Sequence, residues 1–438
     1  MFSISKKKFY ISIFIFFLVF SLTSSFTVKA ASGTLSEGKL YSRYCALIDG
    51  DSGRLLYGKN PDAQAPMAST TKIMTCYLAL KCIPDNYTAT TSAYAASMPD
   101  VQLNAVKGQQ FRLSDLLYSL MLKSHNDTAV IIAENYAFHY LCTNPAMISN
   151  DTFKDINLSF LTSEMLASDD SSVLSGLKAE ESKALVQVFA CFMNQQAESW
   201  GCTHTYYITP NGLDAADETG EHCTTAYELA IVMSKCIDVP EFNAICQTKS
   251  YSFSDLSNKS TYTVTNANAF LNMYENIIAG KTGFTGNAGY CYVCAYKADG
   301  RTFIVALLAC GWPPDKTRKW KDARLLLNYA REHYYKKEIL GCEILTTPVK
   351  VYKGDSDYAY VQNQYPYDTL LSDFDSVNIL YDIPSAVNAP VYSGTYAGNA
   401  HIYINDTHVL DIPLTYCSSI SKVSFISAFI TLLDNYLL

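Results

Sequence analysis

The spacing of apolar and polar positions along the chain predicts a mixed α/β protein. Residues 41–58 alternate as two strands around the turn-forming run Asp49-Gly50-Asp51-Ser52-Gly53. Apolar residues then recur at helical spacing, which predicts a series of helices. These cover residues 69–82, 114–121, 127–140 and 225–238, with further helical stretches inside 155–200 and a polar, turn-rich segment at 201–225.

The periodicity changes after residue 276, where three segments predict successive strands. They span residues 277–283, 289–296 and 302–310, and Asp299-Gly300 supplies a hairpin turn between the last two. A helix with one apolar face is predicted over residues 319–335. Two strands, a helical insert, three strands and a closing helix predict an α/β domain with a mostly antiparallel sheet.

The remainder of the chain predicts a small all-β domain followed by an apolar tail. Short strands are expected at 349–352, 358–361 and 377–381, with a hairpin formed by 401–404 and 408–414. Residues 418–438 carry apolar side chains at helical spacing and only Lys422 and Asp434 as charges. Because these charges lie within the segment, we expect an amphipathic helix in the membrane interface rather than a spanning one. The alternative is a helix packed on the protein's own surface.

The first 30 residues have the features of a secretory signal. Lys6-Lys7-Lys8 precedes an apolar stretch from Phe9 to Leu22, and cleavage is expected after Ala30. An uncleaved membrane anchor is the alternative, and both predict an exported protein. The full chain has a net charge of −8. Without residues 1–30 it keeps 29 basic and 41 acidic residues, a net charge of −12, which argues against nucleic acid as a partner.

The fourteen cysteines and seven histidines show no pattern typical of a metal site. Cys291 and Cys294 are spaced as Cys-x-x-Cys but lie in a predicted strand, where residues three apart face opposite sides. Buried thiols are therefore expected at both positions. Since neither His-Glu-x-x-His nor a Cys/His cluster at zinc spacing occurs, no metal is expected.

Candidate chemistry begins with Ser69-Thr70-Thr71-Lys72. A serine and a lysine three residues apart on a helix share one face, so the lysine can accept the serine's proton if burial lowers its pKa. The same spacing occurs elsewhere, for example at Ser36 and Ser175. Only the Ser69 copy combines a predicted helix start with apolar flanks.

Two further motifs follow in order. In Ser124-His125-Asn126, a hydroxyl and an amide two residues apart in a loop can point into one cleft. Lys281-Thr282-Gly283 lies on a predicted strand, where the lysine and the hydroxyl can hold a carboxylate. Gly283 there allows close approach of a substrate backbone.

The order of these three motifs resembles that of the serine D-alanyl-D-alanine carboxypeptidases, the low-molecular-mass penicillin-binding proteins. The resemblance extends to the segments Pro66–Thr75, Asn211–Asp214, His222–Ala230 and Lys281–Gly289 and covers roughly residues 35–335. It implies the penicillin-binding-protein/β-lactamase fold. The expected domains are a signal peptide (1–30), a catalytic domain (31–338), a β-rich domain (339–416) and a membrane-associating tail (417–438).

The resemblance also implies a role for each site residue. Ser69 is expected to be the nucleophile, Lys72 its general base and Ser124 a proton relay to the leaving D-Ala. Asn126 is expected to position the peptide, Lys281 and Thr282 to bind the terminal carboxylate, and the backbone N–H groups of Ser69 and Phe284 to form the oxyanion hole. No cofactor is implied. The implied partners are the D-Ala-D-Ala stem peptide of peptidoglycan, β-lactam antibiotics and, through the tail, the outer face of the cytoplasmic membrane.

Two positions depart from the family pattern. His125 stands where a smaller residue is usual; it either lines the cleft and makes activity sensitive between about pH 5 and 8, or is a tolerated variant. Asn211 replaces a histidine, and the turn is expected to survive because Gly212 supplies its conformation.

Two other functions remain as alternatives. A serine β-lactamase would need an efficient deacylating water, yet no Glu-x-x-Leu-Asn segment occurs between Ser124 and Lys281. A non-catalytic peptidoglycan-binding regulator would not need all of the motif residues to be intact.

Overall fold

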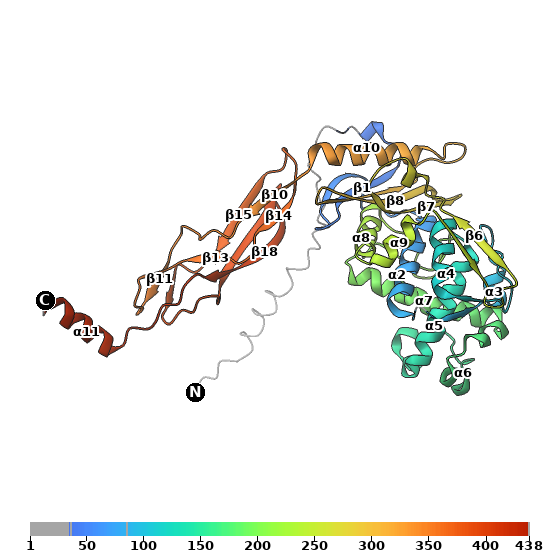
Figure 1. The fold of residues 1–438 in the computed structure, drawn as a ribbon, viewed down its shortest axis with the longest axis horizontal. Coiled ribbons are helices and arrows are strands. Elements are labelled where there is room, and N and C mark those ends of the chain that lie inside the picture. The colour runs from blue at the N-terminus through green and yellow to red at the C-terminus, as the bar shows by residue number, and fades with distance from the viewer. Residues whose placement is uncertain (1–34, 36, 85, 437–438) are drawn as a thin grey trace, which may run out of the picture. The chain divides into compact units, whose positions relative to one another are not determined.

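A five-stranded antiparallel sheet forms the centre of the first part of the protein (Figure 1). The structure is a computed structural model that describes residue 35 and residues 37–84 and 86–436, so the predicted signal peptide lies outside the described residues. The strand order is β2-β1-β9-β8-β7, which leaves β7 at an edge. The strands are β1 (Tyr44–Asp49), β2 (Leu55–Lys59), β7 (Ile277–Thr285), β8 (Gly289–Ala298) and β9 (Arg301–Leu308).

Helices cover both faces of this sheet. The helix α10 (Arg318–His333) packs on one face through Ala323, Leu326 and Leu327, which are fully buried against apolar side chains of β1, β8 and β9. The helix α8 (Ala226–Cys236) contacts β1, β8 and β9 from the opposite side, as Figure 1 shows. The predicted order of strands, helical insert and closing helix is therefore confirmed.

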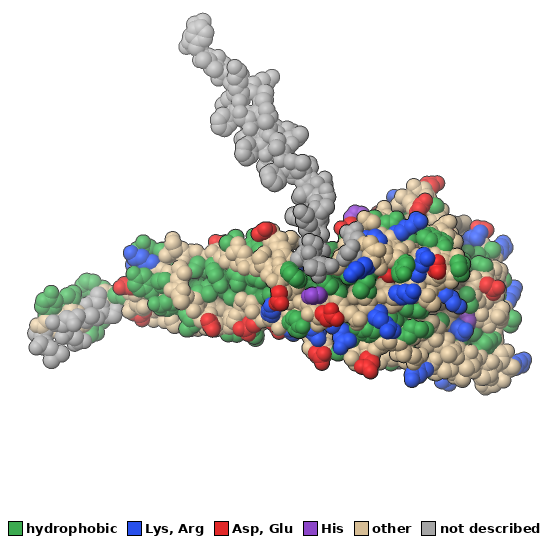
Figure 2. Space-filling view, turned by 90° about the horizontal axis from the view of Figure 1, so that it is seen from above, with side chains coloured by type: hydrophobic (Ala, Val, Ile, Leu, Met, Phe, Trp, Pro, Cys, Tyr) green, Lys and Arg blue, Asp and Glu red, His purple; other side chains and the backbone are tan. Residues whose placement is uncertain are grey.

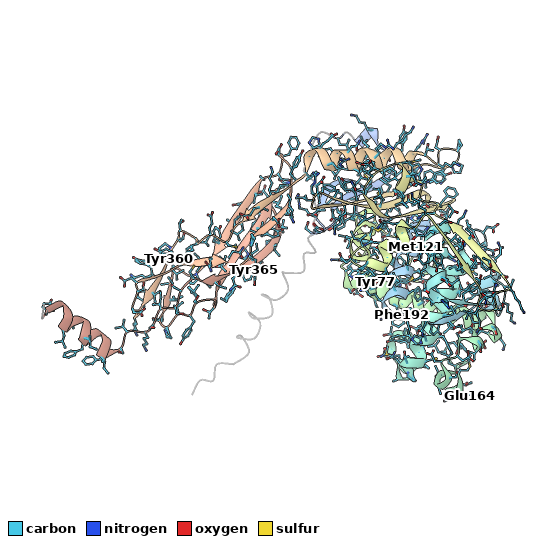
Figure 3. The ribbon with its side chains drawn as sticks, viewed as in Figure 1. Tyr77, Met121, Glu164, Phe192, Tyr360 and Tyr365 are labelled. Carbon is cyan, nitrogen blue, oxygen red and sulfur yellow. The ribbon has the colours of Figure 1, made fainter. Side chains whose placement is uncertain are left out.

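The segment between β2 and β7 forms a helical region around α5 (Asn126–Thr143), most of whose residues are buried. The other helices are α2 (Lys72–Cys82), α3 (Ala93–Ala96), α4 (Leu113–Tyr118), α6 (Ser163–Ser168), α7 (Ala179–Ser199) and α9 (Pro240–Gln247). Short 3₁₀ turns are η1 (Glu37–Lys39), η2 (Ala68–Thr71), η4 (Pro145–Ser149), η5 (Asp151–Phe153), η6 (Ser171–Gly176) and η7 (Ala269–Asn272), and η3 (Ser119–Lys123) is a π-helix. Figure 3 labels Tyr77 of α2 and Phe192 of α7 in this region.

Two antiparallel strand pairs in the insert were not predicted from the sequence. The strands β3 (Thr88–Thr90) and β4 (Gln110–Arg112) form one, with α3 between them along the chain, and β5 (Ser250–Ser254) and β6 (Thr261–Thr265) form the other, which is a hairpin. This hairpin is held by stacked rings, with the Phe253 and Tyr262 centroids 5.5 Å apart. Its strands, Ser-Tyr-Ser-Phe-Ser and Thr-Tyr-Thr-Val-Thr, alternate polar and apolar residues, which is a signal for half-buried strands that the sequence does carry.

The part after residue 335 is β-rich and has its own apolar core, which includes Val349, Val361, Ile402 and Leu414. Figure 3 labels Tyr360 and Tyr365 in this part. Its strands are β10 (Tyr335–Leu340), β11 (Val349–Tyr352), β12 (Tyr358–Ala359), β13 (Val361–Asn363), β14 (Tyr367–Leu371), β15 (Val377–Asp382), β16 (Ala386–Asn388), β17 (Tyr396–Ile404) and β18 (Thr407–Tyr416). The strand β10 follows α10 directly and spans residues 338 and 339, where the sequence predicted the domain boundary. The position of this boundary stays a prediction.

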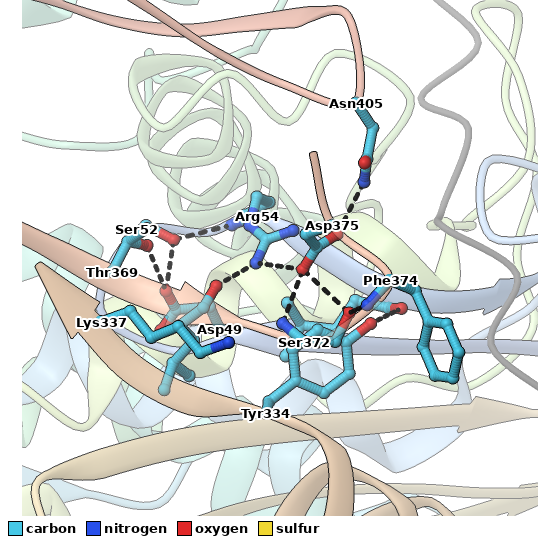
Figure 4. Close-up of polar contacts among 12 residues, drawn as sticks. Asp49, Ser52, Arg54, Tyr334, Lys337, Thr369, Ser372, Phe374, Asp375 and Asn405 are labelled. Carbon is cyan, nitrogen blue, oxygen red and sulfur yellow. Dashed lines mark hydrogen bonds and ion pairs between the residues drawn. The ribbon is translucent and has the colours of Figure 1, made fainter. Parts of the chain in front are cut away.

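A partly buried polar cluster joins the β1–β2 turn to the β-rich part (Figure 4). The Arg54 guanidinium donates to the Leu370 carbonyl and lies 3.5 Å from Asp375, whose side chain is fully buried. Asp375 also accepts a hydrogen bond of 2.6 Å from the Asn405 amide. Such a charge is stable only while it is paired, so these contacts tie the two parts together.

The C-terminal tail differs from the prediction in one respect. Its helix, α11, runs only from Phe425 to Tyr436. Residues 418–424 are not helical, because Ile420 and Lys422 form bridges to the β-rich part and Ile420 is buried in its core. Apolar side chains of α11 are exposed in Figure 2. Among the described residues, no helix has the length and apolarity needed to cross a membrane.

All fourteen cysteines lie in the described part of the chain and are unpaired. Cys291 and Cys294 are fully buried, and burial raises the pKa of each thiol to about 12. Cys294 faces the core beneath α10, whereas the Cys291 thiol points to the carbonyl of Pro66. Buried thiols on opposite faces of the strand are thus confirmed.

Candidate active site

Ser69 lies in the turn η2, immediately before the helix α2 begins at Lys72. The Nζ atom of Lys72 lies at hydrogen-bond distance, 2.9 Å, from the Ser69 hydroxyl oxygen, so the predicted pair is formed. Ser69 is partly exposed, whereas the Lys72 side chain is fully buried. The preceding residue, Ala68, has a φ of 48°, an uncommon conformation for alanine that is typical of strained functional sites.

The surroundings of Lys72 suit a neutral amine. Besides Ser69, its Nζ contacts the side-chain oxygen of Asn126 at 2.9 Å and the carbonyl oxygen of Asn211 at 2.6 Å. The two carbonyl-type oxygens, of Asn126 and Asn211, can only accept hydrogen bonds, whereas the Ser69 hydroxyl can also donate one. A neutral amine has two N–H groups for the two obligate acceptors and a lone pair for the hydroxyl proton. Burial, and then the charge of Lys281, hold the pKa of Lys72 well below its usual value.

A tight loop supplies the carbonyl of Asn211. The next residue, Gly212, has a φ of 83°, and a Cβ there would overlap the carbonyl group of Ala68. The Asn211 amide oxygen accepts from the N–H of Leu213 at 3.0 Å. The loop therefore depends on Gly212, as predicted, and the Asn211 contribution to the site is its backbone oxygen.

His222 fixes this loop to the nucleophile turn. Its Nδ1 accepts from the N–H of Ile208 at 2.9 Å, which places the proton of the neutral ring on Nε2. Nε2 lies 2.8 Å from the hydroxyl of Thr71, which donates in turn to the Ala68 carbonyl at 2.9 Å. Burial, and then Lys72, lower the pKa of His222 to about 4, so it is neutral at physiological pH.

A second serine–lysine pair lies on the other side of the site. The Lys281 ammonium donates to the Ser124 hydroxyl at 2.8 Å and to the Thr282 carbonyl at 3.0 Å. Lys281 is buried, and burial lowers its pKa to about 7. Ser124 follows the π-helix η3 and has a left-handed φ of 69°, which directs the chain into α5.

The first turn of α5 connects the two pairs. The Asn126 amide donates to the carbonyls of Pro99 and Asp100 at 3.0 and 3.1 Å, while its oxygen accepts from Lys72. Asp127 accepts from backbone N–H groups at residues 103, 105 and 128. This carboxylate is thus engaged in holding the loop that covers Asn126.

The edge strand β7 approaches the nucleophile directly. A Cβ built on Gly283 would lie 3.0 Å from the backbone nitrogen of Ser69, a contact tighter than normal packing. Glycine is therefore required where β7 passes η2. Thr282 is partly exposed and Phe284 is 43% exposed, its ring beside that of Tyr290 at 4.8 Å.

The structure contradicts the hypothesis that His125 confers pH sensitivity. Its imidazole is buried and hydrogen-bonds through Nδ1 to the Ser119 hydroxyl at 2.8 Å. Burial lowers the pKa of His125 to about 4, so the ring stays neutral from about pH 5 to 8. The interpretation of His125 as a tolerated variant fits this environment.

The fit of Gly212 against η2 leads to a stability prediction. Replacing Gly212 with alanine adds left-handed strain of about 1–2 kcal/mol and overlap of about 1–3 kcal/mol. Gly201 is the matched control, because its φ is 77° but nothing lies within 4 Å of a Cβ there. In urea titrations, we expect Gly212→Ala to lose more unfolding free energy than Gly201→Ala. The Gly212→Ala variant should also lose covalent labelling by penicillin. Equal losses would contradict the close approach.

Taken together, the site has the geometry of a Ser–Lys acyl-transfer centre. The partly exposed hydroxyls of Ser69 and Ser124 face two buried lysines, and an asparagine lies between them. The motifs predicted from the sequence are therefore brought together. The sequence did not assign two features of the site: the loop carbonyl of Asn211 and the hydrogen bond between His222 and Thr71. His222 nevertheless lies in a segment that resembled the family.

Comparison with known proteins gives a family that uses this kind of acyl-transfer centre. The family model described as D-alanyl-D-alanine carboxypeptidase matches residues 30–139 and 174–310. Because the match covers more than half of the chain, the protein belongs to the D-alanyl-D-alanine carboxypeptidase family.

Individual relatives are distant but extend over nearly the whole chain. The D-alanyl-D-alanine carboxypeptidase DacF of Bacillus subtilis is 22% identical over 429 residues, covering 96% of each protein. The carboxypeptidase DacD of Escherichia coli is 23% identical over 425 residues, covering 93% of this chain and 94% of its own. Penicillin binding protein 5 of Haemophilus influenzae has a similar structure, with a TM-score of 0.63 at 21% identity over 89% of this chain and 100% of its own. The predicted fold is thus confirmed.

Proposed function

We propose that this protein is a serine-type D-Ala-D-Ala carboxypeptidase that removes the terminal D-Ala of peptidoglycan stem peptides. The observation that carries the proposal is the Ser69–Lys72 pair facing the Lys281–Ser124 pair beside the edge of β7. Membership of the D-alanyl-D-alanine carboxypeptidase family supports the same reaction.

The reaction begins with attack of the Ser69 oxygen on the carbonyl carbon of the penultimate D-Ala. Lys72, as a neutral amine, accepts the hydroxyl proton during the attack. The backbone N–H groups of Ser69 and Phe284 stabilise the oxyanion, a role supported by the close approach of β7 to the Ser69 nitrogen. Collapse of the tetrahedral intermediate breaks the peptide bond, and the proton that Lys72 accepted passes through Ser124 to the leaving D-Ala nitrogen, which returns Lys72 to its neutral form. The product is an ester on Ser69, which water hydrolyses.

Lys281 and Thr282 bind the carboxylate of the terminal D-Ala. The Lys281 pKa of about 7 applies to the free site, and a bound carboxylate raises it by stabilising the ammonium. The Asn126 amide donates to the carbonyls of residues 99 and 100, and its oxygen accepts from Lys72, so Asn126 acts here by positioning Lys72. A direct contact of Asn126 with the peptide stays a prediction. No step requires a metal ion or an organic cofactor.

Substrate charge tests this binding role. We expect Lys281→Ala to lose turnover of free-acid D-Ala-D-Ala peptides, because it removes a charge-assisted contact with the carboxylate. The wild type should turn over amidated peptides poorly. Release of D-Ala or D-alaninamide, measured by chromatography, gives kcat/KM for each peptide. Equal turnover of acid and amide by the wild type would contradict the carboxylate-binding role.

Hydrolysis of β-lactams is the less favoured alternative. In the described part of the chain, Ser69 and Lys72 hydrogen-bond to each other, to the Asn126 side chain and to the Asn211 carbonyl oxygen. None of these partners is a glutamate. Asp127 is engaged by three backbone N–H groups. Without a carboxylate to activate water, the penicilloyl ester should persist, so penicillin is expected to act as an inhibitor.

We further propose that the protein is exported and acts at the outer face of the cytoplasmic membrane. The signal-like residues 1–30 support export. The twelve-residue helix α11 would span about 18 Å, less than the ~30 Å of a hydrocarbon core, so it would lie in the interface. Its exposed Phe425, Ile426 and Phe429 would insert among the lipids.

Truncation after Ser424 tests the tail, since residues up to Lys422 belong to the β-rich part. Each buried CH₂ contributes about 0.8 kcal/mol, so loss of α11 should abolish flotation with phospholipid vesicles. The truncated protein should still be labelled by penicillin. The proposal is contradicted if the full-length and truncated proteins float equally well, or if neither of them floats.

A further inference from the structure

Three side chains with metal-binding atoms converge on the hairpin β17–β18, outside the active site. Nδ1 of His401 and Nε2 of His408 each lie 2.6 Å from Oδ1 of Asp411. The three candidate donor atoms are all within 4.8 Å of one another. All three residues lie beyond the segments that match the carboxypeptidase family model.

Strand pairing explains why these residues share one face. His401 is directly opposite Asp411. His408 precedes Asp411 by three residues and would face the other side of a regular strand. The register shifts there, with Tyr403 opposite His408 and Ile402 opposite Leu410, so Val409 is an extra, bulged residue. The bulge returns His408 to the face of His401.

This face of the hairpin is accessible to solvent. Alternate residues of β17, such as Ala400 and Ile402, point into the core, while His401 and Tyr403 face outward. The side chains of His401, His408 and Asp411 are 29%, 47% and 49% exposed. The Tyr403 ring packs edge-on against His408, with centroids 5.3 Å apart, and restricts its rotation. An ion could reach the three donors without any rearrangement of the backbone.

The donor set determines the class of ion. Two imidazole nitrogens and one carboxylate oxygen are ligands typical of zinc and neighbouring first-row metals, whereas magnesium and calcium prefer oxygen alone. Tetrahedral ligands at about 2.0–2.1 Å are roughly 3.3 Å apart. The contacts of 2.6 Å would therefore open by several tenths of an ångström, which exposed side chains can do.

We propose that His401, His408 and Asp411 form a binding site for a divalent transition metal of the zinc class, with solvent completing its coordination. On binding, the ring protons of the two histidines reside on the nitrogens that do not face the ion. The ion joins β17 to β18 and stabilises the β-rich part by binding the folded state alone. The sequence predicted no metal because these three residues share a face only through a bulge, which their spacing along the chain does not reveal.

Metal titration of the mature protein, residues 31–438, tests the proposal. We expect one Zn²⁺ to bind in calorimetry and to raise the melting temperature, whereas Mg²⁺ should do neither. His408→Ala and the size-preserving His408→Gln should each weaken binding about tenfold or more and remove the temperature shift. His204→Ala is the matched control, because His204 is also partly exposed and pairs with a carboxylate, Glu228, in another region. It should bind zinc as the wild type does.

Cobalt distinguishes this site from the cysteines, of which Cys82 and Cys342 are exposed. Bound Co²⁺ should give visible absorption bands without a thiolate charge-transfer band, and His408→Ala should lose these bands. The proposal is overturned if no zinc binds at micromolar concentration, if both His408 variants bind it normally, or if the thiolate band dominates. Penicillin labelling should be unchanged in every His408 variant, so either proposal can fail without the other.

Discussion

Replacing Ser69 with alanine should abolish both D-Ala release and covalent labelling by a fluorescent penicillin. The hydroxyl of Ser69 is the group in contact with the buried Lys72, and no ester can form without it. Loss of a nucleophile in a serine peptidase lowers kcat by up to about 10⁶-fold. Labelling on a denaturing gel and chromatographic detection of D-Ala measure the two effects.

Ser175→Ala is the control for this substitution. Ser175 also has a lysine three residues later, Lys178, but its hydroxyl donates to the Ser172 carbonyl instead of pairing with that lysine. This variant should be labelled as the wild type is. Covalent labelling that persists in Ser69→Ala would show that another residue is the nucleophile.

Replacing Lys72 with methionine should slow acylation by penicillin by about 10²- to 10⁴-fold, the range typical of a lost general base. Methionine has a similar length but cannot take the proton of Ser69. Lys235 is an exposed lysine of α8, and Lys235→Met controls for the loss of a positive charge. Stopped-flow acylation kinetics compare the three proteins. An unchanged rate in Lys72→Met would exclude Lys72 as the base.

The pH dependence of the wild type gives an independent test of the same role. The neutral amine of Lys72 is the active form, so kcat/KM should fall as the pH decreases through its lowered pKa. Lys281 must carry its proton to pair with a carboxylate, so kcat/KM should also fall above about pH 7. Because the two lysines repel each other, the apparent pKa values of the rising and falling parts of the pH profile belong to the coupled pair rather than to either lysine alone. An amidated substrate should lack the dependence on protonated Lys281.

The sequence predicted the sheet and the motif residues correctly because both depend on local patterns. The strands β8 and β9 are largely apolar runs, buried on both faces, and the turn at Asp299-Gly300 has the positive φ values that its residue types favour. Ser69 and Lys72 are one helical turn apart, so their contact follows from the helix itself.

The features that the sequence missed depend on contacts between distant segments. The Asn211 carbonyl reaches Lys72 only because Gly212 lets the loop pass against Ala68. The tail helix was predicted too long because the apolar Ile420 has helical spacing but pairs with Val391 of the β-rich part. Apolar periodicity does not distinguish a helix face from a core contact of this kind.

Mass spectrometry of the protein after penicillin treatment tests the central claim most directly. The intact mass should increase by one penicillin molecule, and the added mass should lie on the peptide that contains Ser69. The increase should persist for many minutes, because no glutamate among the described residues contacts Ser69 or Lys72 to activate the deacylating water. An increase on a peptide without Ser69, or no increase in a folded protein, would contradict the assignment of Ser69 and Lys72 as the acyl-transfer pair.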